Sequence, residues 1–116
     1  MSRRDVEPLL HDIVKAGQRI LDYIGSESVK EYVSDEVAHD VAERNFITIG
    51  EALMQVLKAF PELDKNFFRG ARIHRVSTRA DPRLPHDRSI RVWSIIESDL
   101  PRLLTECRSL LGELPA

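Results

Sequence analysis

Apolar residues recur at steps of three and four positions through most of this chain, and this spacing constrains its fold more than any other feature. The first series runs from Asp5 to Ile24 and leaves most charged residues on the opposite side. Positions at this spacing share one face of an α-helix, so the series predicts an amphipathic helix of about five turns. No stretch alternates apolar and polar residues as a strand does.

Capping and breaking residues divide the chain into further helices. Asp5 is predicted to cap the first helix and Gly25 to end it. A short helical segment is expected over Ser28–Val33. A long helix is expected over Asp35–Phe60, and Pro61 ends it because a proline disfavours the helical conformation of the residue before it.

The long helix carries its own apolar stripe and one internal glycine. The stripe predicted to be buried consists of Val37, Val41, Phe46, Ile49, Leu53, Val56, Leu57 and Phe60. Gly50 costs about 1 kcal/mol relative to alanine inside a helix, so we expect another helix to cross closely there. Arg44 and Glu51 lie on either side and are expected to form a buried polar pair or to line a cleft.

The second half of the chain is interrupted by prolines. Helix is expected to continue over Lys65–Thr78, but Pro82 and Pro85 forbid a regular helix between them. A last helix is predicted to start near Asp87 or Arg88 and to bend at Pro101. Together these segments predict an all-α, up-and-down bundle of about four to five helices.

The composition is that of one globular domain, residues 1–116, with 42% hydrophobic and 31% charged residues. No run approaches the roughly 18 apolar residues of a membrane span, and the N-terminus has no signal-peptide core. We therefore expect a cytoplasmic protein that enters no membrane. The single Cys107 agrees with a reducing compartment and is expected to be a small apolar residue on a helix face.

Positive charge is concentrated in residues 69–91. This segment holds seven of the thirteen arginines and two of the four histidines, with only Asp81 and Asp87 as acids; seven less two gives +5 in a chain of net charge −2. Guanidinium groups beside an imidazole can bind and cleave a phosphodiester. The rest of the chain carries a net negative charge. This argues against a protein that coats nucleic acid and favours a local basic site on an acidic protein.

Three blocks of the sequence resemble the HepT-like branch of the HEPN superfamily. In the family's order they are RRDVEPLLHDIVKAGQRILDYIG, VAERNFITIGEAL and DRSIRVWSIIESDLPRLL. The resemblance implies a small all-helical homodimer, the toxin of a toxin–antitoxin pair whose antitoxin is an MntA-type minimal nucleotidyltransferase. It also implies a metal-independent endoribonuclease with an RNA substrate, whose motif is Arg, four to six residues, then His, commonly followed at the second position by Tyr.

Two pairs satisfy the spacing of that motif. Arg69 and His74 have four residues between them, and Arg79 and His86 have six. Family members carry the histidine about eleven residues before a tryptophan, whereas here His86 lies seven and His74 nineteen residues before Trp93. Arg79 and His86 are preferred because the residues leading to Arg79 resemble the family's approach to its arginine.

The family's tyrosine is missing after both histidines, where Val76 and Arg88 stand instead. Related antitoxins silence the toxin by attaching AMP to that tyrosine, so this control is not expected here. Tyr23 and Tyr32 are distant in sequence, and neither is assigned that role. Three hypotheses stay open: an active ribonuclease with its site at a dimer cleft, a non-catalytic substrate-binding or docking subunit of a nucleotidyltransferase, and a helical dimer without activity.

Residues 82–84 admit a further hypothesis. Pro-Arg-Leu can be encoded CCA CGG CTA, and with a following C a shift of one base reads CAC GGC TAC, or His-Gly-Tyr. That would put a family-type His-x-Tyr eleven residues before Trp93 and make the Arg/His pairs coincidental. The nucleotide sequence of the gene tests this, since codons that do not permit the shifted frame exclude it.

Cleavage of RNA without a metal needs a base for the 2′-hydroxyl, an acid for the leaving 5′-oxygen and positive charge at the phosphorus. His86 or His74 is the predicted acid/base group, and Arg79 or Arg69 the predicted phosphate clamp. A dimer would bring two copies of both groups together. The alternative is that these residues form a solvated basic loop.

No cofactor and no metal site are predicted. His11 and His39 lie near acidic residues, but no pair has a recognised metal-ligand spacing with a third partner. Exposed helix positions are therefore expected for both histidines.

Overall fold

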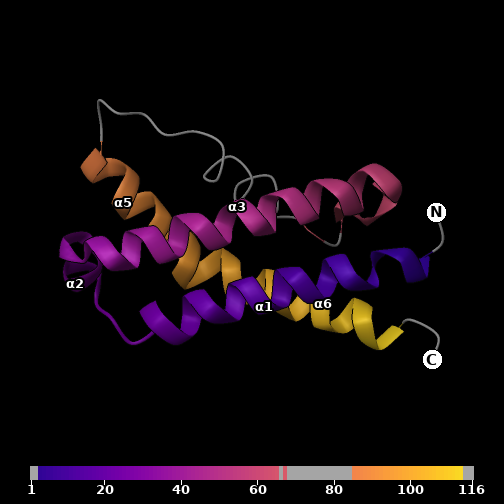
Figure 1. Cartoon of the computed structure of the whole chain (residues 1–116), viewed down its shortest axis with the longest axis horizontal. Helices are drawn as coiled ribbons and strands as arrows, with labels where there is room; N and C mark the ends of the chain where they lie inside the picture. The colour runs from indigo at the N-terminus through magenta and orange to yellow at the C-terminus, as the bar shows by residue number, and fades with distance from the viewer. Residues whose placement is uncertain (1–2, 66, 68–84, 114–116) are drawn as a thin grey trace.

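A computed structural model describes residues 3–65, 67 and 85–113, and over these residues it contains helices and no strand (Figure 1). The elements are η1 (Arg3–Val6), α1 (Glu7–Ile24), α2 (Val29–Ser34), α3 (Glu36–Ala59), η2 (Pro61–Lys65), α5 (Pro85–Ser94), the π-helical η3 (Ile95–Asp99) and α6 (Leu100–Glu113). The predicted all-α class is confirmed, and the number of helices roughly fits. The helix expected over Lys65–Thr78 falls almost entirely outside the described residues.

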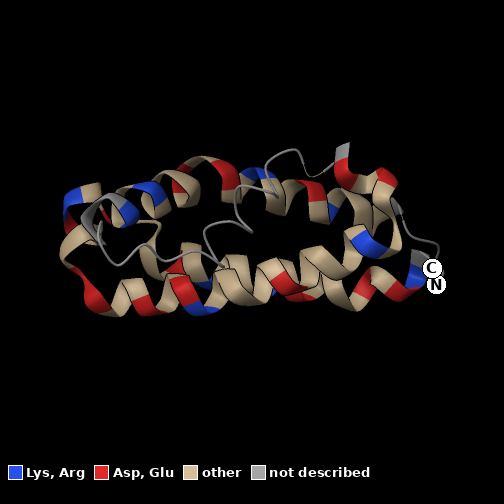
Figure 2. Cartoon of the chain, turned by 90° about the horizontal axis from the view of Figure 1, so that it is seen from above, with Lys and Arg blue, Asp and Glu red and all other residues tan. Residues whose placement is uncertain are grey.

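Three rods of helix pack side by side: α1, α3, and α5 continued through η3 into α6 (Figure 1). The first two run antiparallel. The α5–α6 rod runs in the same direction as α3, so the up-and-down alternation holds between α1 and α3 only. Acidic and basic residues are interspersed along the outer surfaces of the helices (Figure 2). None of the described helices combines the length and the apolar character needed to cross a bilayer.

The apolar series of the first helix forms one side of the core, as predicted. Its most deeply buried members are Leu10, Ile13, Ile20 and Ile24, each at most 1% exposed. Full burial of such a side chain contributes about 1.5–3 kcal/mol, so this face holds α1 in the bundle. Cys107 is likewise buried on α6, as expected, and burial raises the pKa of its thiol to about 12.

Side-chain caps begin α2 and α3. Ser28 Oγ accepts a hydrogen bond from the Glu31 backbone N–H at 3.2 Å, and Glu31 Oε1 accepts one from the Ser28 backbone N–H at 2.9 Å. This reciprocal capping box satisfies two N–H groups that the helix itself leaves without acceptors, and the bonds lower the pKa of Glu31. Asp35 Oδ1 accepts from the Ala38 N–H at 3.0 Å and begins α3.

One predicted boundary is wrong and two are confirmed. Asp5 does not cap α1, because it lies in the 3-10 turn η1 and Val6 occupies the N-cap position. Gly25 ends α1 as expected. Pro61 ends α3, and Phe60 before it has left the helical conformation with φ −135° and ψ 78°.

The buried stripe of α3 differs from the prediction at its start. Val37 is 57% exposed and Val41 half-buried, because Ala38 and Ala42 occupy the buried face there. Farther along, the prediction is confirmed for Phe46, Ile49, Leu53 and Val56, with Leu57 and Phe60 partly buried. Arg44 and Glu51 are both exposed, so the expected buried polar pair is wrong.

The bend expected at Pro101 takes the form of the π-helical segment just before it. The Leu100 N–H bonds to the carbonyl of Ile95, five residues earlier. A proline inside a helix offers no N–H to the carbonyl four residues back, and its ring crowds that carbonyl. The wider π turn relieves the conflict and joins α5 to α6 as one bent rod.

Helices α1 and α6 approach closely at Gly17. A Cβ at this position would lie 2.5 Å from Cδ2 of Leu104, which is itself only 1% exposed. Gly50, where a close crossing was expected, is also buried in α3.

We predict that Gly17→Val destabilises the bundle by about 1–3 kcal/mol, because the added methyl groups must displace Leu104 in a packed core. The matched control is Gly112→Val near the end of α6, where a Cβ meets no atom within 4 Å. Urea unfolding followed by circular dichroism measures both. Equal stabilities for the two variants would contradict the close packing of α1 on α6.

Candidate functional site

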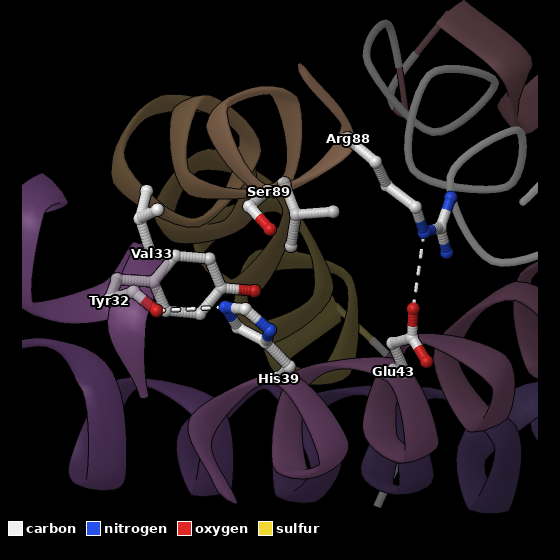
Figure 3. A pocket seen from close by; sticks show the side chains of 7 residues that line it. Tyr32, Val33, His39, Glu43, Arg88 and Ser89 are labelled. Atoms are coloured by element: carbon white, nitrogen blue, oxygen red, sulfur yellow. Dashed lines mark hydrogen bonds and ion pairs between the residues drawn. The ribbon is translucent and has the colours of Figure 1, made fainter. Parts of the chain in front are cut away.

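An open pocket of about 300 Å³ lies where α2, α3 and α5 meet (Figure 3). We call it the α2–α3–α5 pocket. Its lining consists of Tyr32, Val33, His39, Glu43, Arg88, Ser89 and Val92. The pocket thus brings a phenol, an imidazole, a carboxylate, a guanidinium and a hydroxyl together from parts of the chain that are distant in sequence.

Tyr32 is the buried centre of this site. It is only 2% exposed, and its ring lies 4.8 Å from the ring of His39 and 5.7 Å from that of Trp93, centroid to centroid. The Tyr32 hydroxyl points into the pocket (Figure 3), and no described residue forms a hydrogen bond with it. A hydroxyl that faces an open pocket can form a hydrogen bond with a group that enters it.

The environment of the Tyr32 hydroxyl is negative. Burial raises the pKa of Tyr32 above its ordinary value of 10.0, and the Glu43 carboxylate raises it further. Arg88 acts in the opposite direction, whereas Glu27 and Asp35 add to the rise. The phenol therefore stays protonated at neutral pH, in a field that three carboxylates and one guanidinium produce together.

His39 is held in one orientation by the backbone of α2. Its Nε2 lies 2.8 Å from the carbonyl oxygen of Tyr32. A carbonyl can only accept, so Nε2 carries the hydrogen and Nδ1 of the neutral ring is an acceptor. The expectation that His39 is exposed is wrong, because packing against Tyr32 half-buries it; His11 is exposed as expected.

An ion pair joins α5 to α3 at the edge of the pocket. Arg88 Nε lies 3.1 Å from Glu43 Oε1, with the two side chains 20% and 48% exposed. A pair this accessible contributes at most about 1 kcal/mol, so its main effect is to orient the two groups. Ser89 follows Arg88 and faces the same pocket (Figure 3).

Of the residues predicted to form the catalytic site, Arg69, His74 and Arg79 lie outside the described residues. His86 lies in the first turn of α5, two positions before Arg88. Of the four predicted residues, His86 is therefore the one in a described helix, and that helix, α5, contributes Arg88 and Ser89 to the α2–α3–α5 pocket.

Tyr32, His39 and Glu43 were not predicted as site residues. His39 and Glu43 are four positions apart, which places them on one face of a helix, and this spacing was a usable signal. No sequence pattern pointed to Tyr32, since its place depends on how α2 packs against α3 and α5.

A second, larger groove of about 640 Å³ lies between α1 and α3. Arg44 lines it together with Asn45, and Tyr23 and Val37 stand exposed there at 47% and 57%. Of the two roles expected for Arg44, lining a cleft is therefore the one observed. Within the described ranges, no group of three or more acidic, His or Cys side chains is placed to hold a metal ion.

We predict that Glu27→Gln stabilises the protein at neutral pH. Glu27 Oε1 is buried without a hydrogen-bond partner among the described residues, and burial, followed by the Asp35 carboxylate, raises the Glu27 pKa above its ordinary 4.5. A raised carboxyl pKa means that the folded state holds the proton more tightly, so stability falls as pH rises through that range.

The gain in Glu27→Gln should be a few tenths to about 1 kcal/mol at pH 7 and close to zero at pH 4, measured by urea unfolding. Glu51→Gln, at an exposed position on α3, is the control. A gain that is the same at both pH values would contradict the proposed cause.

Comparison of the chain with models of protein families, with curated protein sequences and with solved structures found no match. The candidate site therefore depends on the geometry described above, and the resemblance to the HepT-like family depends on the three sequence blocks alone.

Proposed function

We propose that this chain is a HepT-like toxin subunit that acts as a metal-independent endoribonuclease, with its site formed by the basic segment and the α2–α3–α5 pocket. The observation that carries the proposal is the position of His86. It lies three positions before Ser89 in α5, and Ser89 lines a pocket that holds a second histidine and the Tyr32 hydroxyl. The all-helical architecture is the one that the resemblance implies.

The proposed reaction is an internal attack within the RNA. His86 accepts the proton of a 2′-hydroxyl, whose oxygen then bonds to the adjacent phosphorus, and the bond from phosphorus to the 5′-oxygen breaks. The leaving oxygen takes a proton from an imidazolium, either His86 after its first transfer or the same residue of a second copy. Arg79, or Arg69 in the other pair, holds the phosphate oxygens and offsets the charge that develops on them.

The partners follow from the same proposal. A homodimer would bring two basic segments to one cleft, and an MntA-type nucleotidyltransferase would be the antitoxin. The protein would act on RNA in the cytoplasm.

A second candidate is a non-catalytic subunit that presents a substrate or a docking surface to a nucleotidyltransferase. It is favoured by Arg88, which stands where the resemblance places a tyrosine and is paired instead with Glu43. This candidate needs neither His86 nor His74 for its activity.

We predict that the purified chain cleaves total tRNA or an mRNA in EDTA and that His86→Ala slows cleavage by about 10²–10⁴-fold, since that is the usual contribution of an acid/base group. His74→Ala should have little effect. His11→Ala, at an exposed position on α1, is the control for the loss of an imidazole.

Loss of cleavage in His74→Ala alone would transfer the role to the Arg69 and His74 pair. The absence of cleavage, or cleavage that persists in the His74→Ala and His86→Ala double variant, would refute the ribonuclease proposal and favour the binding subunit.

A further inference from the structure

We infer that the α2–α3–α5 pocket binds a guanine base and reads its Watson–Crick edge. That the base belongs to an RNA substrate rests on the proposed function. The binding of guanine itself does not, because it requires only the side chains that line the pocket.

The first argument is the order of donors and acceptors around the pocket. Arg88 lies above Glu43 at one end of the pocket, His39 lies between this pair and the ring of Tyr32, and the Tyr32 hydroxyl lies beside the His39 ring (Figure 3). A guanidinium donates, a carboxylate accepts, and Nδ1 of His39 accepts because Nε2 donates to the Tyr32 carbonyl. The order is donor, acceptor, acceptor.

Guanine presents the complementary order. Its O6 accepts, and its N1–H and N2 amino group donate. In the inferred complex Arg88 donates to O6, Glu43 accepts from N1–H, and His39 Nδ1 or the Tyr32 hydroxyl accepts from the N2 amino group. Arg88 Nε lies 3.1 Å from Glu43 Oε1, so the two groups stand side by side as this contact requires.

The other three bases fit less well. Cytosine and adenine would each present a ring nitrogen acceptor to the Glu43 carboxylate, and uracil would present an acceptor in place of the N2 amino group. Each of these mismatches replaces a hydrogen bond with two acceptors that face each other, which disfavours the ligand. The selectivity therefore follows from hydrogen bonding and does not require shape to distinguish the bases.

The surroundings favour a neutral, donor-rich base over a phosphate. Among the described residues, Glu43, Glu27 and Asp35 act on the Tyr32 hydroxyl as negative charges and Arg88 acts as a positive charge. An anion in this pocket would be repelled by the three carboxylates, whereas amino and imino hydrogens would be attracted. Val33 and Val92 supply apolar surface for the faces of the ring, and about 300 Å³ is at the small end of ligand pockets.

The test uses the single tryptophan, Trp93, whose ring lies 5.7 Å from that of Tyr32. Trp93 fluorescence of the full chain is titrated with 5′-GMP, 5′-AMP, 5′-CMP, 5′-UMP and ribose 5-phosphate. We expect 5′-GMP to bind at least about tenfold more tightly than the others. Glu43→Gln should weaken 5′-GMP about tenfold or more and Tyr32→Phe by a smaller factor, while the exposed Glu51→Gln on the same helix changes nothing.

The inference would be overturned by equal affinity for all four nucleotides, by binding of ribose 5-phosphate as tight as that of 5′-GMP, or by no binding at all. Agmatine is included because a guanidinium also offers several donors. Agmatine binding as tight as that of 5′-GMP would assign the pocket to a cationic side chain of a protein partner and would also reject guanine.

Guanine binding without RNA cleavage would refute the proposed function alone, and cleavage without a guanine preference would refute the pocket inference alone.

Discussion

The packing of Tyr32 between His39 and Trp93 is the contact on which the candidate site depends. It joins three helices, since Tyr32 belongs to α2, His39 to α3 and Trp93 to α5. Aromatic pairs of this kind contribute about 0.5–1.5 kcal/mol beyond the area that they bury. The contact also determines the tautomer of His39, because Tyr32 supplies the carbonyl that receives Nε2–H, and so determines which hydrogen bonds the pocket offers.

This arrangement carries a cost in stability. Glu27 Oε1 is buried without a hydrogen-bond partner among the described residues, and burial and the Asp35 carboxylate raise the Glu27 pKa, so the charged form of this group disfavours the folded state. Proteins retain such features where they serve binding or catalysis. The rest of the core is apolar and well packed, as at Gly17 and Leu104, and offsets the cost.

The helices could be predicted from the sequence where a local rule decides them. Periodicity predicted α1, and Pro61 predicted the end of α3. Other features depend on tertiary packing or on local structure that no sequence pattern indicates. The exposure of Val37 depends on which face of α3 meets its neighbours. The start of α1 depends on a preceding 3-10 turn that no pattern predicted. The site residues were harder to predict than the helices. A histidine on a polar helix face is predicted to be exposed, because the sequence does not show that a neighbouring helix covers it. The sequence therefore predicts an exposed His39, and the concentration of arginine and histidine in residues 69–91 predicts the site there instead.

We propose that one site both reads guanine and cleaves RNA beside it. This is tested by cleavage in EDTA of an oligoribonucleotide with a single guanosine, compared with the same sequence containing inosine, which lacks only the N2 amino group. We expect a cut at the guanosine and about tenfold slower cleavage of the inosine substrate, because His39 and Tyr32 lose their donor. Equal rates for the two substrates, or cuts that ignore the guanosine, would contradict it.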